Sequence, residues 1–115
     1  MVDRWLEDVK RKVDPSLLGM ILVHNGVVRG TSKDGKPVTG MQLSYDQLKL
    51  DSFVERFKAR DGIVDIKVWI NEGTLKVGDD IMMLLVAGRL RTDVLPVFQE
   101  LLSAIKNEIV IEKET

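Results

Sequence analysis

The pattern of apolar and polar residues predicts three helices. Apolar side chains recur every third or fourth position with charged residues between them, which is the period of a helix with one buried face. The three stretches are residues 2–13, 48–62 and 92–108. Each is followed by a glycine, a proline or a change of period, so three separate helices are expected rather than one long one.

Capping residues set the expected starts of the second and third helices. Asp51 or Ser52 is suited to accept a hydrogen bond from the free backbone N–H groups of the second helix. Thr92 or Asp93 is suited to the same role in the third helix. Pro96 is then expected in the first turn of that helix, where the missing N–H costs little.

The remaining periodic stretches predict strands. They are either continuously apolar and rich in Val and Ile, or they alternate apolar and polar residues. These stretches are residues 20–28, 38–46, 63–70, 81–88 and 109–113. Residues 29–40 are expected to form a polar loop with a turn at Asp34-Gly35, and residues 71–80 a turn-rich link.

The order of these elements predicts the fold class. The sequence α-β-β-α-β-β-α-β favours an α+β fold with a largely antiparallel sheet and flanking helices. The chain has 115 residues, of which 44% are hydrophobic and 30% charged, so a single domain over residues 1–115 is expected.

Composition removes several functional classes. The net charge is −1, which does not favour nucleic acid or an anionic membrane as partner. Cysteine is absent, and His24 is the one histidine, so no metal site is expected. The N-terminus is charged, and no apolar run approaches the roughly 20 residues of a membrane span. A cytoplasmic protein is therefore expected, and His24 is interpreted as a hydrogen-bonded core or interface residue.

Candidate chemistry rests on basic residues at the ends of predicted elements. Arg29 follows a buried strand, and Arg91 follows another strand and precedes the third helix. Lys106 and Lys113 come at and after the end of that helix. Such residues are well placed to hold an anion where helix N-termini present free N–H groups. Spacing alone favours scattered surface charges, because the chain has 17 Lys and Arg.

Two stretches resemble a known family. The first contains an apolar strand ending in Gly-x-Val-Arg, a glycine-containing loop and an alternating strand ending near a tyrosine. Its residues are Gly19, Gly26, Val28, Arg29, Gly35, Val38 and Tyr45. The second contains a Gly-x-Leu-x-x-Gly-Asp turn, formed by Gly73, Leu75, Gly78 and Asp79. Together they resemble the large (catalytic) subunit of molybdopterin synthase, the MoaE family.

The resemblance implies a fold, a reaction and a set of residues. It implies an α/β hammerhead-type fold and a homodimer that binds a small ubiquitin-like sulfur carrier ending in Gly-Gly. The carrier's thiocarboxylate gives sulfur to cyclic pyranopterin monophosphate and forms molybdopterin, with no cofactor. In the family an arginine precedes the last helix and two functional lysines follow it, seven apart. Arg91, Lys106 and Lys113 fall on these positions as substrate-binding and catalytic residues, with Arg29 and Tyr45 also expected at the substrate.

Departures from the family pattern support an alternative. Leu90 stands where the family usually has a histidine, Glu112 replaces a tryptophan, and Glu114 replaces a residue that is often basic. The chain also ends at Thr115, where family members typically continue. The alternative is a non-catalytic dimeric relative that binds a carrier protein or a pterin without turnover.

Overall fold

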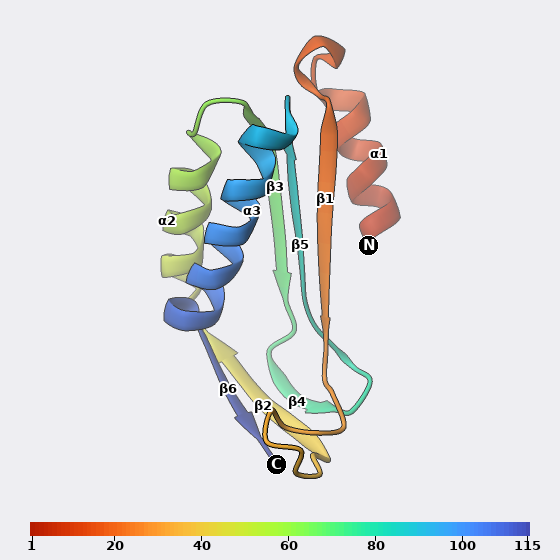
Figure 1. Ribbon diagram of the computed structural model, residues 1–115, viewed down its shortest axis with the longest axis vertical. Coiled ribbons are helices and arrows are strands. Elements are labelled where there is room, and N and C mark those ends of the chain that lie inside the picture. Colours follow the sequence, from red (N-terminus) through yellow and green to blue (C-terminus); the bar gives the residue numbers. More distant parts are fainter.

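The computed structural model describes residues 1–115, which fold into an elongated body of 47 × 25 × 23 Å (Figure 1). The helical elements are α1 (Val2–Lys12), η1 (Pro15–Leu17), α2 (Gln47–Lys58), α3 (Arg91–Ala104) and η2 (Ile105–Ile109). The strands are β1 (Met20–Val27), β2 (Gly40–Tyr45), β3 (Ile63–Ile70), β4 (Gly73–Lys76), β5 (Asp80–Gly88) and β6 (Val110–Glu114). The α+β class with antiparallel sheets is confirmed.

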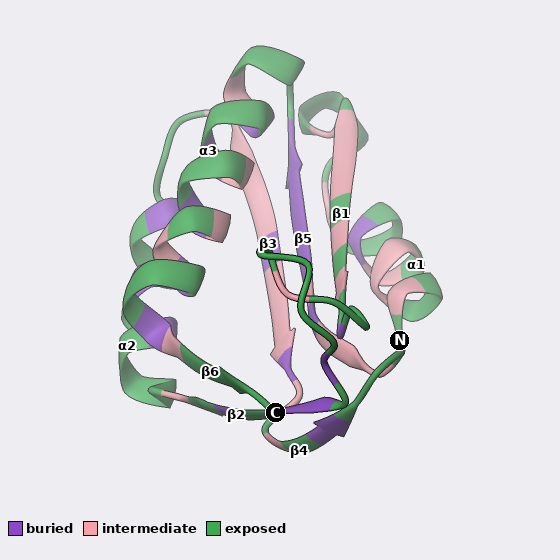
Figure 2. Ribbon diagram, turned by 60° about the horizontal axis from the view of Figure 1, so that its bottom comes forward, coloured by how far each residue is buried: buried purple, intermediate pink, exposed green.

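The first sheet has the order β1-β5-β3, with β5 in the middle. Its centre is buried because β5 is a nearly continuous apolar run, and Leu84, Leu85 and Val86 have no exposed surface (Figure 2). One face packs against α2 and α3 and carries most of the core. On the other face, α1 places Val9 against Leu85 and Ala87.

The second sheet has the order β4-β2-β6 and lies at the end of the molecule where the chain terminates. Strand β4 lies within residues 71–80, so the expected turn-rich link is wrong there. The strand has only four residues and buries one apolar side chain, Leu75, which is too short a pattern to indicate a strand. Pairing with β2 makes it a strand, and this is a tertiary effect.

Helix α2 starts earlier and ends earlier than expected. Asp46 is its N-cap and accepts a hydrogen bond from the backbone N–H of Lys49 at 3.1 Å. The predicted caps, Asp51 and Ser52, lie inside the helix. Asp51 instead accepts a hydrogen bond from the side-chain amide of Gln47 at 2.8 Å, one turn away along the helix.

Helix α3 also departs from the prediction at both ends. Leu90 is the N-cap and makes no side-chain hydrogen bond, so neither Thr92 nor Asp93 caps the helix. Because α3 begins at Arg91, Pro96 lies in its second turn rather than its first. At its other end the helix does not continue as an α-helix to residue 108 but passes into the π-helical turn η2.

The predicted turn at Asp34-Gly35 is present. Gly35 has φ +82°, and its N–H donates to the carbonyl of Ser32 at 3.0 Å. None of the helices combines the length and the apolar character that crossing a bilayer requires.

Candidate functional site

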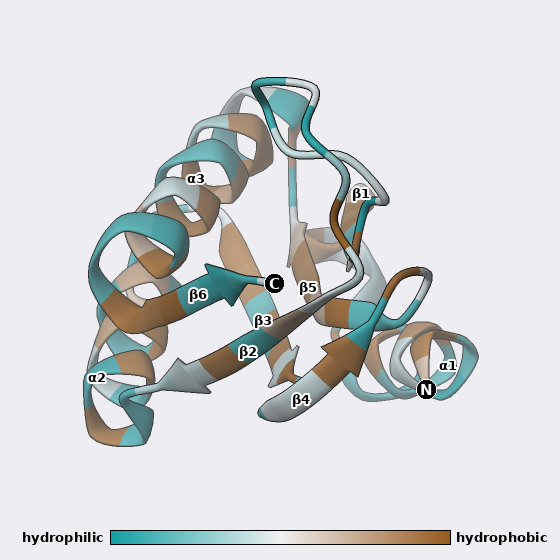
Figure 3. Ribbon diagram, turned by 90° about the horizontal axis from the view of Figure 1, so that it is seen from below, coloured by the Kyte–Doolittle hydropathy of each residue, from teal (hydrophilic) through white to brown (hydrophobic).

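One cleft brings together charged side chains from separate parts of the chain. Its volume is about 320 Å³, and it lies where the end of β1, the following loop, η2 and β6 meet. Its charged lining residues are Arg29, Lys33, Asp34, Lys106, Glu112 and Glu114. Figure 3 views this end of the molecule, with the C-terminus near the centre. The structure thus brings two predicted site residues, Arg29 and Lys106, to one cleft.

The Gly-x-Val-Arg segment and the Gly-x-Leu-x-x-Gly-Asp turn are hydrogen-bonded to each other next to Arg29. The N–H of Val28 donates to the carbonyl of Asp79, and the N–H of Gly78 donates to the carbonyl of Val28, both at 2.9 Å. Gly78 has φ +92°, a conformation that glycine adopts without strain. Val28 is buried, so the chain leaves the core at Arg29, whose Nε donates to the carbonyl of Thr31 at 2.8 Å.

Lys106 lies on the π-helical turn that follows α3. Ile105 and Ile109 are buried at the two ends of the turn and anchor it in the core. The backbone N–H of Val110 closes the turn by donating to the carbonyl of Ile105. Such turns interrupt α-helices frequently at functional sites. Here the turn carries the exposed Lys106 to the wall of the cleft.

Strand β6 supplies two carboxylates to the cleft and directs Lys113 elsewhere. Glu112 and Glu114 are two residues apart, so their side chains lie on the same face of the strand. Their partners on β2 are the buried Leu43 and Met41, and Met41 also lines the cleft. Lys113 falls between the two glutamates and projects from the opposite face of β6. It does not line the cleft.

Arg91 and Tyr45 also lie away from the cleft. Arg91 is the first residue of α3, and Lys106 follows the end of that helix, about 20 Å away at 1.5 Å per residue. Tyr45 ends β2, packs against the main core, and donates its hydroxyl hydrogen to Oε1 of Gln47 at 2.6 Å. Within one chain, neither residue joins Arg29 and Lys106.

His24 lies on β1 beneath this region and lacks the hydrogen bond that was expected for a core histidine. Its Nε2 is buried without a partner. Its ring contacts Phe98 edge to face, with 6.5 Å between ring centroids. Burial is the main cause that lowers the pKa of His24, and the positive charge of Lys106 lowers it further.

The charges that line the cleft do not neutralise one another by direct pairing. No carboxylate oxygen of Asp34, Glu112 or Glu114 lies within 4.0 Å of a cationic nitrogen. Elsewhere acidic residues do form such pairs, for example Asp8 with Lys67 at 2.8 Å. The chain contains no group of three His, Cys, Asp or Glu side chains close enough to hold a metal ion.

Strand alternation in residues 109–113, extended by one residue, is the signal that places Glu112 and Glu114 together on one wall. No sequence signal marks the two loop residues, Lys33 and Asp34, as cleft residues. The loop that holds them closes on itself, with the N–H of Ser32 donating to the carbonyl of Lys36 at 2.9 Å.

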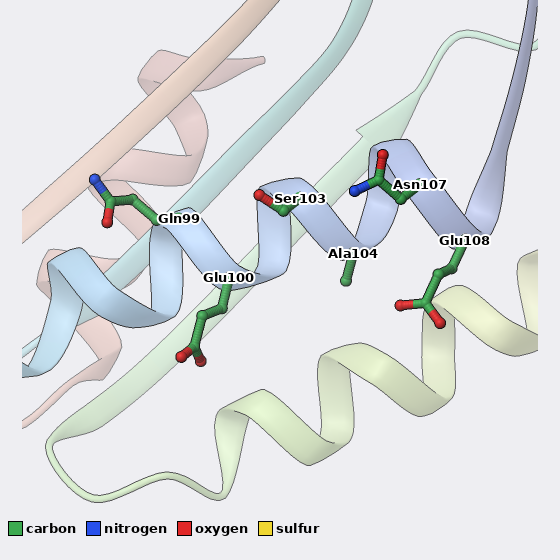
Figure 4. Close-up of a pocket in the computed structure, with 6 residues that line it drawn as sticks. All are labelled: Gln99, Glu100, Ser103, Ala104, Asn107 and Glu108. Carbon is green, nitrogen blue, oxygen red and sulfur yellow. The ribbon is translucent and has the colours of Figure 1, made fainter.

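A second hollow lies on the outer surface of α3 and η2 (Figure 4). Its volume is about 400 Å³, and its lining includes Glu100, Ser103, Asn107 and Glu108 but no cation. Because none of the predicted site residues lines it, and because its charges are acidic, it does not suit an anionic substrate.

Known structures share this fold. The MoaE protein from Burkholderia ambifaria has a TM-score of 0.79 at 21% identity, covering 100% of this chain and 76% of that one. Molybdopterin synthase from Staphylococcus aureus has a TM-score of 0.77 at 17% identity, covering 96% of this chain and 82% of that one. A complex of subunits 1 and 2 of molybdopterin-converting factor from Helicobacter pylori has a TM-score of 0.76 at 19% identity, covering 98% and 74%.

These matches define the class of protein as an α+β chain with the molybdopterin synthase large-subunit fold, as predicted. The family model of the MoaE protein matches residues 3–108. The chain therefore belongs to the MoaE family, and this membership places it in molybdenum cofactor biosynthesis. No curated protein sequence matches it.

Proposed function

We propose that this chain transfers sulfur from a thiocarboxylated carrier protein to cyclic pyranopterin monophosphate, at the cleft lined by Arg29 and Lys106. The observation that carries the proposal is the meeting of these two residues, which are distant in sequence, at one cleft. The arginine and the lysine both match positions that the family resemblance marks as functional. An enzyme of the sulfurtransferase type is consistent with the family as a whole.

The cationic residues suit the charges of this reaction. The guanidinium of Arg29 presents several N–H donors to a phosphate, and one of its nitrogens is already held by the Thr31 carbonyl. The ammonium of Lys106 carries charge and exchangeable protons at the same cleft. We assign to it stabilisation of negative charge at the reacting carbon and proton transfer there.

The sulfur donor is a small carrier subunit whose C-terminal Gly-Gly thiocarboxylate enters the cleft. The complex of two molybdopterin-converting factor subunits from Helicobacter pylori, which shares this fold, supports a two-subunit assembly. A glycine-ended tail suits a narrow entry because it has no side chains. Transfer joins the sulfur to a substrate carbon, and water then breaks its bond to the carrier's terminal carbonyl, so that the carrier leaves with an ordinary carboxylate. A second carrier supplies the second sulfur of the dithiolene.

A homodimer of this chain completes the proposal. Arg91 is exposed at the far end of α3 and has no ion-pair partner within 4.0 Å. A single chain therefore cannot use Arg91 and Lys106 on one substrate. In a dimer that sets α3 of one subunit beside the cleft of the other, the two residues meet.

One specific observation favours the alternative of a relative that binds without turnover. Glu112 and Glu114 line the same cleft as Lys106 and add negative charge beside the proposed phosphate site. Like charges repel an anionic substrate and weaken its binding. The alternative therefore predicts binding of the carrier or a pterin, with no product.

A reconstituted reaction separates the two functions. The protein is mixed with thiocarboxylated carrier and cyclic pyranopterin monophosphate, and dithiolene product is measured. We expect product, and a loss of at least about 100-fold in rate for Lys106→Ala, which removes a group that acts in the transition state. Lys49→Ala is the matched control, because Lys49 is exposed on α2, away from the cleft. Carrier binding without any product would instead establish the non-catalytic relative.

A further inference from the structure

The cleft has a basic wall, from the end of β1 and from η2, and an acidic wall, from β6. Arg29 and Lys106 face it from the end of β1 and from η2, while Glu112 and Glu114 face it from β6. No ion pair within 4.0 Å links the walls. Both sets of groups are therefore free to bind a ligand.

The acidic wall belongs to a hydrogen-bonded strand and not to a loose tail. β6 pairs with β2 along its whole length. Beyond it, the N–H of Thr39 donates to the carbonyl of Thr115 at 2.8 Å, and the N–H of Thr115 donates to the carbonyl of Gly40 at 3.0 Å. The hydroxyl of Thr39 adds a bond of 3.1 Å to the same carbonyl of Thr115. Glu112 and Glu114 therefore start from a fixed backbone.

The backbone of the basic wall is anchored as well. The Arg29 side chain is tied to the loop by its bond to the Thr31 carbonyl. Lys106 follows Ile105, which has no exposed surface. A ligand between the walls must satisfy cations at one side and carboxylates at the other. A simple polyanion can bind only to the wall that carries Arg29 and Lys106, because the carboxylates of the other wall repel it.

We infer that Glu112 and Glu114 recognise the hydrogen-bond donor edge of the pterin ring while Arg29 and Lys106 hold its phosphate. This inference rests on the proposed function. The 2-amino-4-oxopyrimidine ring of a pterin presents an amino group and a ring N–H side by side, and an ionised carboxylate accepts two such parallel bonds. The two glutamates then orient the substrate in the cleft and select pterins over other phosphate esters.

Geometry supports recognition of an organic donor edge rather than of a cation. The carboxylates of Glu112 and Glu114 share the cleft with Asp34, but no three acidic groups lie close enough together to hold a metal ion. Two carboxylates at alternate strand positions are instead spaced along one edge of the cleft. A flat ring lying against β6 meets them with its edge.

The test compares two stable probes that each carry half of the substrate's chemistry. One is 6-hydroxymethylpterin, which has the donor edge and no phosphate, and the other is phenyl phosphate, which has the phosphate and no donor edge. Binding of the first is followed by pterin fluorescence and of the second by calorimetry. We expect the double variant Glu112→Gln with Glu114→Gln to bind the pterin at least about tenfold more weakly, because an amide replaces each charged acceptor. Phenyl phosphate binding should stay unchanged or become tighter.

Two further variants make the pattern specific. Arg29→Ala should weaken phenyl phosphate and spare the pterin. Glu108→Gln is the matched control. Glu108 is an exposed glutamate of η2, and it lines the hollow on α3 and η2 instead of the cleft. It should change neither affinity. Circular dichroism confirms that each variant is folded, as expected for exposed side chains.

The inference is overturned if the double variant binds the pterin as well as the native protein does, or binds both probes more tightly. It is overturned too if the native protein does not bind the pterin. If the native protein forms dithiolene product and the double variant binds the pterin as well as the native protein does, the proposed function still holds and only this inference fails. A native protein that shows the expected probe pattern but forms no product would contradict only the proposed function.

Discussion

At the scale of single residues, His24 is the most informative side chain outside the cleft. It is the one histidine in the chain, so it is the main side chain whose charge changes at a pH between the pKa values of the carboxylates and those of the amines. Burial lowers its pKa from the ordinary value of 6.5, and the nearby charge of Lys106 lowers it further. The folded protein therefore holds His24 neutral where the unfolded chain is already taking up a proton.

This difference predicts a pH dependence of stability. Because the folded-state pKa lies below 6.5, the unfolded state binds more protons as the pH falls past that value. Stability is then full above about pH 7.5, declines below pH 6.5, and levels off once the folded-state pKa has been passed. Thermal unfolding measured between about pH 7.5 and about pH 5 should show a falling midpoint.

The control is His24→Phe, which keeps an aromatic ring against Phe98 and removes the titration. Its unfolding midpoint should change little over the same pH range. A native protein and a variant with parallel profiles would show that another group is responsible.

The predicted pair Lys106 and Lys113 shows what spacing reveals about a site and what it omits. Both lysines fall on positions that the family resemblance marks as functional, but their spacing does not show where their side chains point. A π-helical turn and the first residues of β6 lie between them, so neither the helix period nor the strand period applies throughout. Lys106 lines the cleft and Lys113 leaves from the opposite face of β6. The role of Lys113 stays a prediction.

At the scale of elements, the start of α2 gives a direct test of the revised cap. Asp46→Ala removes the hydrogen bond to the Lys49 N–H and should lower the free energy of unfolding by about 1 kcal/mol. Asp51→Ala is the matched control, because Asp51 is the cap that the sequence suggested and lies inside the helix. It should cost less than about 0.5 kcal/mol. Urea denaturation measures both, and a larger loss for Asp51→Ala would restore the original assignment.

The turn that carries Lys106 depends on its buried anchors. Ile105→Ala creates a cavity at a side chain with no exposed surface, and should cost about 2–5 kcal/mol of unfolding free energy. Ile111 is 69% exposed on β6, so Ile111→Ala should stay within about 0.5 kcal/mol of the native protein. Equal losses in urea denaturation would mean that the turn is not anchored through Ile105.

Most long elements were predictable, and the exceptions share a cause. β5 could be predicted because its whole apolar run supports the same assignment. β4 and η2 could not, because β4 exists through its pairing with β2 and η2 through the burial of Ile105 and Ile109 against the core. Such contacts between distant segments leave no periodic pattern. η2 forms part of the cleft, so the shape of the cleft could not be predicted from the sequence either.

At the scale of the whole molecule, the position of Arg91 bears on assembly. The cleft is lined by residues of η2 and of β6, a strand of the second sheet, and Arg91 is the first residue of α3. The second sheet and the start of α3 lie at opposite ends of the molecule (Figure 1). A role for Arg91 at the cleft therefore requires a second subunit. A two-fold dimer supplies this arrangement twice, with each subunit giving one arginine and one lysine to two equivalent sites.

Mixing two inactive variants tests this arrangement. Arg91→Ala and Lys106→Ala should each lose activity as pure dimers, because each site lacks one residue. In a mixed dimer, one site receives both altered residues and the other receives both native ones. Half of the dimers in an equal mixture are mixed, so about a quarter of the native dithiolene-forming activity should return. If each pure variant is inactive and the mixture stays inactive although subunits exchange, Arg91 and Lys106 do not share a site across the dimer.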